Sequence, residues 1–201
     1  MNPLLVLGAA YLIGAIPFGY LLVKLKSGND VRSMGSGNIG ATNVLRTAGR
    51  TAGIVTLLLD IGKGALAVWI ADRVTDGSPV WMSAAALAVM AGHAYPVFLN
   101  FHGGKAVASF TGAFLYLTPL ALLATLILFV ALVAASRFIS LASVVGAGCF
   151  PLAVFLIDHP PVPVFLAALV AGGFIVVRHK SNLKRIRAGN ENVFSFGGRL
   201  G

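Results

Sequence analysis

Six long apolar segments, separated by short polar stretches, make up most of this 201-residue chain. They cover residues 3–23, 51–70, 80–99, 106–135, 139–157 and 162–177. Charged residues are only 10% of the chain, against about 25% in an ordinary soluble domain. Such a chain has too few polar groups to cover a surface that faces water, and about 20 apolar residues form a helix that crosses a bilayer. We therefore predict an all-α integral membrane protein.

The charges predict how often the chain crosses the membrane. Segment 106–135 is too long for one upright helix, and Thr118-Pro119 near its middle offers a turn. Dividing it there gives seven transmembrane helices, two of them short, and we expect Pro17 to kink the first. Fourteen of the fifteen lysines and arginines then share one side and only Arg73 lies on the other. The positive-inside rule therefore places the N-terminus outside and the C-terminus on the cytoplasmic side.

We expect a single domain over residues 1–201, with cytoplasmic loops at about 24–50, 100–105 and 136–140 and a cytoplasmic tail at 178–201. The positive-inside bias and attraction to anionic lipids account for most of the net charge of +9. The basic loops have few aromatic residues that could stack on bases, so we expect no nucleic-acid partner. The lone Cys149 excludes an internal disulfide.

The first cytoplasmic loop contains the glycine-rich run Met34–Arg46. Three glycines in six positions, Gly35, Gly37 and Gly40, can turn several backbone N–H groups toward one anion. The run also holds short polar side chains and one fixed cation, namely Ser36, Asn38, Thr42, Asn43 and Arg46. A helix that starts near Thr42 would add its free N–H groups. The alternative is an ordinary glycine-rich turn in which Thr42 only caps a helix.

A second polar run follows the third apolar segment, where Gly92-His93 and Pro96 lead to His102-Gly103-Gly104-Lys105. Two glycines before a lysine that opens a helix would bring backbone donors and an ammonium group to one anion. Alternatively, Lys105 reaches the membrane interface and the glycines let helices approach. Asp60 and Lys63, three residues apart and a turn or two inside their span, should pair and support the glycine loop.

A third polar run, Arg178–Glu191, continues the last apolar segment, so helical spacing should place His179, Asn182 and Arg185 on one face. The alternative is a basic amphipathic tail on the lipid surface. Ser143 adds a hydroxyl just inside the sixth helix, although most such serines bond only their own backbone.

Together these runs resemble the signature motifs of one family, the bacterial glycerol-3-phosphate acyltransferases that use acyl phosphate (the PlsY family). The matching stretches are Gly35–Asn43, Gly92–Lys105 and Arg178–Arg185, in order and across nearly the whole chain, and Asp60-x-x-Lys63-Gly64 fits as well. The resemblance implies a seven-helix inner-membrane enzyme that acylates the 1-hydroxyl of glycerol 3-phosphate. Lysophosphatidate and inorganic phosphate would be the products, with no metal, cofactor or CoA thioester. The chain departs from the family pattern in two places. Ala106 and Ser109 stand where the family usually has glycine and threonine, and the lysine expected soon after Glu191 is missing.

The resemblance and the residues together give the following expected roles. The catalytic group is Ser36, Asn38, Lys105, His179 and Asn182. The groups that bind substrate phosphates are Gly37, Gly40, Thr42, Asn43, Arg46, Gly103, Gly104, Ser143 and Arg185. The supporting residues are Asp60, Lys63, His93 and His102. The Ser36–Asn43 loop would hold one phosphate beneath His179 and Asn182, and Arg46, Lys105 and Ser143 the other, or the reverse.

The proton acceptor for the attacking hydroxyl stays open at this point, among His93, His102, His179 and the phosphate of the donor itself. We expect acyl phosphate, glycerol 3-phosphate and membrane lipids as partners, and a monomer with no obligate protein partner. The main alternative function is a small transporter of an organic phosphate, although a transporter site usually lies near the bilayer midplane. A scaffold at the membrane surface is a third reading, but it leaves both glycine runs unexplained.

Overall fold

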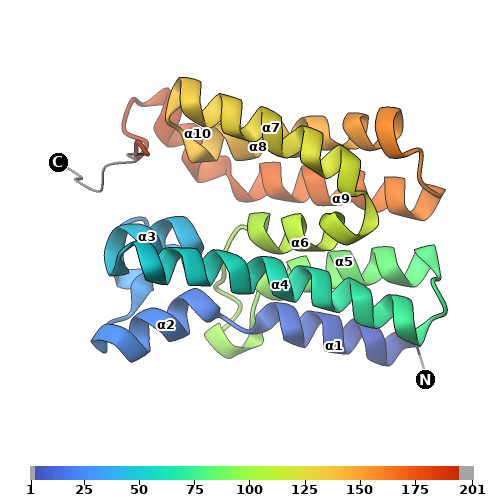
Figure 1. The fold of residues 1–201 in the computed structure, drawn as a ribbon. Coiled ribbons are helices and arrows are strands. Elements are labelled where there is room, and N and C mark those ends of the chain that lie inside the picture. The colour runs from blue at the N-terminus through green and yellow to red at the C-terminus, as the bar shows by residue number, and fades with distance from the viewer. Residues whose placement is uncertain (1–2, 195–201) are drawn as a thin grey trace. The chain divides into compact units, whose positions relative to one another are not determined.

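The structure of the chain is a computed structural model that describes residues 3–194, and all regular secondary structure in that range is helical (Figure 1). The chain folds into two compact units, Met1–Leu117 and Thr118–Gly201. The predicted all-α class is therefore confirmed. That the chain works as a single domain stays a prediction, and each unit is considered by itself below.

The first unit contains six α-helices and two 3₁₀ turns. They are α1 (Pro3–Ala15), α2 (Phe18–Ser27), η1 (Val31–Ser33), α3 (Ala41–Ala48), α4 (Arg50–Val74), α5 (Pro79–Ala94), η2 (Val97–Leu99) and α6 (Val107–Leu117). α4 runs alongside both α1 and α2 (Figure 1). α5 packs on α1, and α6 packs on α4.

The predicted kink at Pro17 is confirmed as a break between α1 and α2. Proline has no N–H group, so the helical ladder is interrupted there. Phe18 donates its N–H to the Ile16 carbonyl at 3.2 Å, and Leu21 donates to the Pro17 carbonyl at 3.0 Å as α2 begins. The break redirects the chain inside its first apolar segment.

Glycines let the helices of the first unit lie close together. A Cβ atom at Gly112 of α6 would collide with the Ile61 carbonyl of α4, and one at Gly64 of α4 would collide with the Ser109 carbonyl of α6. Small residues at such contacts are typical of helices that pack within membranes. The α4–α6 contact fixes where α6 begins, and with it the loop that carries Lys105.

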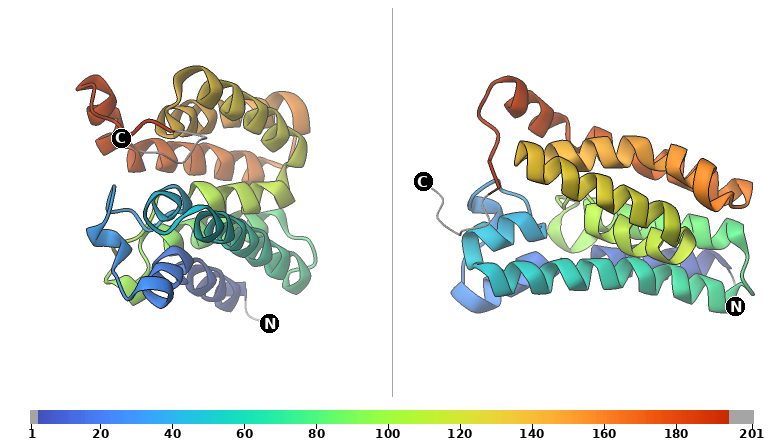
Figure 2. Two further views of the ribbon diagram at one scale, coloured as in Figure 1. Left: turned by 60° about the vertical axis from the view of Figure 1, so that its left-hand side comes forward. Right: turned by 45° about the horizontal axis from the view of Figure 1, so that its top comes forward.

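The second unit contains four α-helices and one π-helical turn. They are α7 (Pro119–Ser136), α8 (Ile139–Ala153), η3 (Val154–Asp158), α9 (Val162–Arg178) and α10 (Lys180–Arg187). α10 is bent by 50° from α9. The change of direction where α10, in dark red, follows α9 can be followed in Figure 2 (right). The expectation that the last span runs straight into the basic motif is therefore wrong, because the helix breaks at His179.

Within residues 3–194, five helices are long and apolar enough to cross a membrane, and the bent α9–α10 pair would be a sixth. The predicted division of segment 106–135 is present, since α6 ends at Leu117 and α7 begins at Pro119. α6 has only 11 residues, so the count of seven stays a prediction. Asp60 lies ten residues after the start of α4, or about 15 Å along it at 1.5 Å per residue. It is thus nearly three turns inside, deeper than the sequence suggested.

Candidate active site

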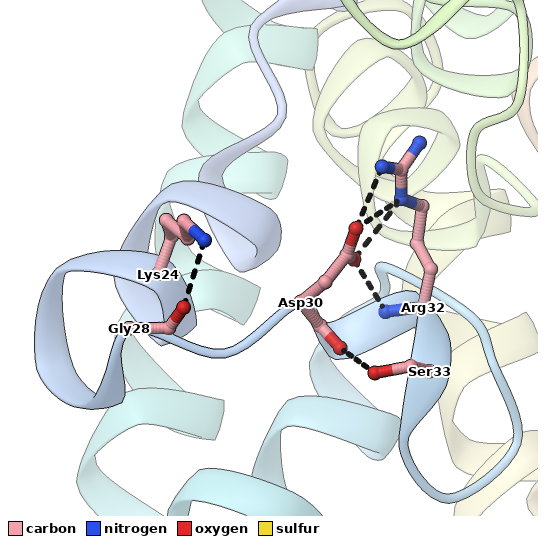
Figure 3. Close-up of polar contacts among 5 residues, drawn as sticks. All are labelled: Lys24, Gly28, Asp30, Arg32 and Ser33. Carbon is pink, nitrogen blue, oxygen red and sulfur yellow. Dashed lines mark hydrogen bonds and ion pairs between the residues drawn. The ribbon is translucent and has the colours of Figure 1, made fainter.

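The segment that leads into the first glycine loop is held by one carboxylate (Figure 3). Asp30 accepts the Arg32 backbone N–H at 2.9 Å and pairs with the Arg32 guanidinium at 2.7 Å, while Ser33 donates its hydroxyl to the Asp30 carbonyl. The side-chain hydrogen bond from Arg32, followed by its backbone N–H, lowers the pKa of Asp30 to about 2. Lys24 closes the end of α2 by donating to the Gly28 carbonyl at 2.7 Å. This segment therefore ties its own charges together and shapes the entry to the loop.

The first glycine loop adopts a backbone that requires glycine at two places. Gly35 and Gly37 have φ values of 56° and 71°, in the left-handed region that other L-residues rarely adopt. Gly37 donates its N–H to the Met34 carbonyl at 3.0 Å, and Gly40 donates its N–H to Asn38 Oδ1 at 2.8 Å. These two N–H groups, which the sequence assigned to an anion, therefore bond within the loop.

Asn43 is the centre around which this loop is built. Its side-chain carbonyl accepts the Ser36 N–H at 2.8 Å. Its Nδ2 atom donates to the carbonyls of Asn38, Met34 and Val31, at 2.8, 3.0 and 3.3 Å. Asn43 is 2% exposed, and all of its side-chain polar atoms face the loop. Any part that Asn43 has in anion binding would therefore act through the loop that it shapes.

The helix predicted to start near Thr42 is present. α3 starts at Ala41 and its N-cap position is Gly40, so the alternative in which Thr42 caps the helix is wrong. The first N–H groups of an α-helix have no partner within the helix, so α3 presents such groups beside the exposed Ser36. Arg46 is half-buried in the last turn of the same helix. This end of the first unit therefore places backbone donors, a hydroxyl and a cation near one another in the chain.

The second glycine loop is anchored to the end of α5. Gly103 donates its N–H to the Ala94 carbonyl at 3.2 Å, and Gly104 donates to the His93 carbonyl at 3.0 Å. These two N–H groups thus donate to backbone carbonyls of the chain, although the sequence predicted that they would bind an anion. Lys105 precedes the first residue of α6, Val107, by two positions and does not itself open the helix. His102 is exposed, with Nδ1 2.6 Å from the Asn100 carbonyl.

A small apolar cluster joins the two glycine loops within the first unit. Leu99, from the turn before the second loop, is buried with Val31, Ile39 and Val44, which flank the first loop. A shared core restricts the movement of one loop relative to the other, because displacing either would expose buried apolar surface. Sequence reasoning gave Leu99 no role beyond the end of the third apolar segment, because a contact with the first loop depends on residues far apart in the chain.

The predicted pair in the middle of α4 is confirmed. Lys63 Nζ lies 2.8 Å from Asp60 Oδ1, and both side chains are 3% exposed. His93 belongs to the same buried group, with Nδ1 3.6 Å from Asp60 Oδ1. Three titratable side chains are therefore enclosed beside the second glycine loop.

The second unit holds a different polar cluster around Glu191. Its carboxylate accepts hydrogen bonds from Ser140 Oγ at 2.9 Å, Asn182 Nδ2 at 2.7 Å and Arg185 Nε at 2.7 Å. The carboxylate is 5% exposed. Burial acts to raise the pKa of Glu191, but the hydrogen bonds from Asn182, Arg185 and Ser140 outweigh it and lower the pKa below its usual value. Asn182 and Arg185 thus share a face, as predicted, and that face bonds a carboxylate of the chain itself.

The remaining candidates of the second unit bond to their own helices. Ser143 donates its hydroxyl to the Ile139 carbonyl at 2.8 Å, as most serines in apolar helices do. His179, 3% exposed, lies at the bend between α9 and α10 with Nδ1 2.8 Å from the Ile175 carbonyl. Sequence reasoning gave Ser140 and Glu191 no role. The signal available for Glu191 was a lone acidic residue beyond a strongly basic helix.

The chain has close relatives across its length. The sequence profile of the family described as "Glycerol-3-phosphate acyltransferase" matches residues 4–189. The glycerol-3-phosphate acyltransferase of Geobacter sulfurreducens is 45% identical over 194 residues, covering 96% of this chain and 98% of that protein. The one from Geotalea daltonii is 45% identical over 190 residues, covering 94% and 96%.

Two crystal structures share the fold. Both are of PlsY (YgiH), described as an integral membrane glycerol 3-phosphate acyltransferase. The glycerol 3-phosphate form matches with a TM-score of 0.91 and 36% identity, and the lysophosphatidic acid form with 0.87 and 34%. Each match covers 97% of this chain and 96% of the other.

Proposed function

This chain belongs to the glycerol-3-phosphate acyltransferase family and is a multi-pass membrane acyltransferase, and we propose that it transfers an acyl group from acyl phosphate to the 1-hydroxyl of sn-glycerol 3-phosphate. The observation that carries the proposal is the match, at a TM-score of 0.91, to a structure described as the glycerol 3-phosphate form of such an enzyme. The products would be lysophosphatidate and inorganic phosphate, and the reaction would be the first step of phospholipid synthesis.

The proposed reaction needs no covalent intermediate on the protein. The substrate hydroxyl oxygen forms a bond to the acyl carbon, the bond from that carbon to the phosphate oxygen breaks, and the hydroxyl proton ends on the departing phosphate or on a histidine. An acyl phosphate is already activated, because phosphate is a good leaving group. The work left to the protein is to hold two anionic substrates together and to stabilise the charge that develops.

The proposed roles follow the chemistry of the side chains in each unit. In the first unit, we assign Ser36, Asn38, Thr42, Arg46 and Lys105 to the binding of substrate phosphate. The residues that would give the loops their shape are those that make a hydrogen bond within the loops or to the end of α5, namely Gly37, Gly40, Asn43, Gly103 and Gly104. In the second unit, we assign Ser143, His179, Asn182 and Arg185 to substrate contact, with Glu191 orienting Asn182 and Arg185.

We further propose seven transmembrane helices with the N-terminus outside, in the inner membrane and with the motif loops at the cytoplasmic face. The distribution of basic residues supports this orientation, since only Arg73 would lie outside. The break between α6 and α7 supports two separate short crossings of segment 106–135.

The test is phosphate release by the purified protein supplied with a long-chain acyl phosphate, with and without glycerol 3-phosphate. We expect release that depends on glycerol 3-phosphate, matches lysophosphatidate formation and falls at least ~100-fold in Lys105→Ala. Lys180→Ala, which removes an exposed lysine from the start of α10, is the matched control. No turnover, together with movement of glycerol 3-phosphate into vesicles, would refute the proposal and identify a transporter.

A further inference from the structure

Three titratable side chains lie buried in the first unit, about halfway along α4. Asp60, Lys63 and His93 are 2%, 4% and 4% exposed. Asp60 Oδ1 faces Lys63 Nζ at 2.8 Å and His93 Nδ1 at 3.6 Å. Charged groups within a membrane-spanning segment are costly and are retained there only for a purpose. The contacts of the outer two members indicate what that purpose is.

Lys63 connects this cluster to the break in the first span. Its Nζ atom donates to the Ile16 carbonyl at 2.9 Å and lies 5.6 Å from the centre of the Phe18 ring. Pro17 interrupts the helical ladder there, so the break leaves carbonyl groups that need donors from elsewhere. The Lys63 side chain therefore donates to a carbonyl at the break and also neutralises the charge of Asp60.

His93 connects the cluster to the second glycine loop. Its backbone carbonyl accepts the Gly104 N–H at 3.0 Å. Its ring lies directly against Gly104, since a Cβ atom there would collide with Nε2. A Cβ atom at Gly103 would collide with the His93 carbonyl. Gly103 and Gly104, the two residues before Lys105, thus pack against the backbone and the imidazole ring of His93.

We infer that His93 is a positioning residue for the loop that carries Lys105, and that Asp60, neutralised by Lys63, holds the imidazole ring in place. The ring lies between the Asp60 carboxylate and the Gly104 backbone, so a ring that moved away from Asp60 would no longer support the loop at Gly104. The inference deepens the proposed function and rests on it in one respect, the contact between Lys105 and a substrate phosphate. The seating of the loop on the ring can be tested without that contact.

The first measurement is hydrogen exchange of the peptide that contains Gly103 and Gly104, in the purified protein without substrate. In His93→Gln and in Asp60→Asn we expect at least ~10-fold faster exchange of these two N–H groups, because the loop loses the support of the imidazole ring and its hydrogen bonds open more often. His159→Gln, an exposed histidine in the second unit, is the matched control and should leave this exchange unchanged. Equal exchange in all variants would overturn the inference, whatever reaction the protein catalyses.

The second measurement is the kinetics of phosphate release against glycerol 3-phosphate concentration and pH. We expect each single variant to lower kcat/KM at least ~10-fold and the double variant to lose no more than the worse single, since both residues act through one loop. The pH-rate profile of His93→Gln should keep its wild-type shape. A loss of at least ~100-fold in kcat, with one limb of the wild-type pH-rate profile abolished, would overturn positioning and identify His93 as the proton acceptor.

A buried charge left without its partner can prevent folding, so Asp60→Asn/Lys63→Gln is the variant that keeps the inference testable. It removes both charges at once and leaves the His93 ring without its carboxylate. We expect this variant to fold and still to show the faster exchange at Gly103 and Gly104. Wild-type exchange and wild-type kcat/KM in this variant would show that the charges only stabilise the helices.

Discussion

Asn43→Asp should disrupt the first glycine loop more than its small change in shape suggests. The new carboxylate can still accept the Ser36 N–H, now at 2.8 Å. The three carbonyls that the amide nitrogen serves, at 2.8 to 3.3 Å, would instead face a second oxygen. Each lost hydrogen bond is worth about 0.5–1.5 kcal/mol, and a buried group left unpaired costs about 1–3 kcal/mol. We expect a loss of roughly 2–4 kcal/mol in the free energy of unfolding.

For a chain of this size, about 2–4 °C of Tm corresponds to each kcal/mol, so the expected fall in Tm is roughly 4–16 °C. Thermal unfolding of the purified protein, followed by the fluorescence of Trp69 and Trp81, measures it. The matched control is Asn38→Asp. The Asn38 side chain accepts the Gly40 N–H through Oδ1, and the substitution leaves its backbone carbonyl, which accepts from Asn43, in place. Aspartate keeps the Oδ1 bond at the start of a helix, where negative charge is favoured.

Asn38→Asp should therefore unfold within about 1–2 °C of the wild type. If Asn43→Asp unfolds at the wild-type temperature, or no lower than Asn38→Asp, then Asn43 does not hold the loop and the reasoning is refuted. If both variants lose stability equally, the cause is the added negative charge and not the lost amide donor.

Three further predictions concern single positions. Because the pKa of Glu191 is lowered in the folded state, its carboxylate stabilises the fold fully above the unfolded pKa of 4.5, and this stabilisation is lost as pH falls from there through the folded pKa. The Tm difference between wild type and Glu191→Gln should therefore hold from neutral pH down to the unfolded pKa and shrink below it, and a difference that stays constant at acidic pH would contradict the prediction. Gly104→Ala adds a Cβ atom that would collide with the His93 imidazole ring, so this variant should raise the KM for glycerol 3-phosphate at least ~10-fold. In the control Gly62→Ala the added Cβ atom meets nothing within 4 Å, and the KM should be unchanged. Ala106 has a φ of 62°, in the left-handed region, so Ala106→Gly should leave the free energy of unfolding equal or raise it by up to about 1 kcal/mol. The control Ala113→Gly, inside α6, should lower the free energy of unfolding by at least ~1 kcal/mol. Equal losses in the two variants, measured by thermal unfolding, would show that the backbone at Ala106 is not strained.

Much of the fold could be predicted because it depends on neighbours in the chain. Runs of apolar residues determine which segments lie in lipid, and Pro17 and Pro119 interrupt helices because proline lacks an N–H group. The Asp60–Lys63 pair followed from a spacing of three residues on one helix. The departure at Ala106 was also visible, although its backbone meaning was not, since a positive φ is a property of the folded loop.

The partners of the polar side chains could not be predicted in the same way. Asn43 was expected to face an anion, but the left-handed backbone at Gly35 and Gly37 turns the loop's own carbonyls toward its amide group. No partner within the chain was predicted for Asn182, and the structure supplies one because the chain returns after α10 and brings Glu191 to it.

The sequence by itself therefore determined that this chain is an all-helical membrane protein and that its helices are interrupted at Pro17 and before Pro119. These properties depend on the composition of contiguous segments and on the geometry of single helices. Only the tertiary structure decided which polar atoms bond to the protein, as with Asn43, Glu191 and the His93 carbonyl. The physical reason is that a buried donor bonds to whichever acceptor the fold leaves unpaired beside it, and residues far apart in the chain supply that acceptor.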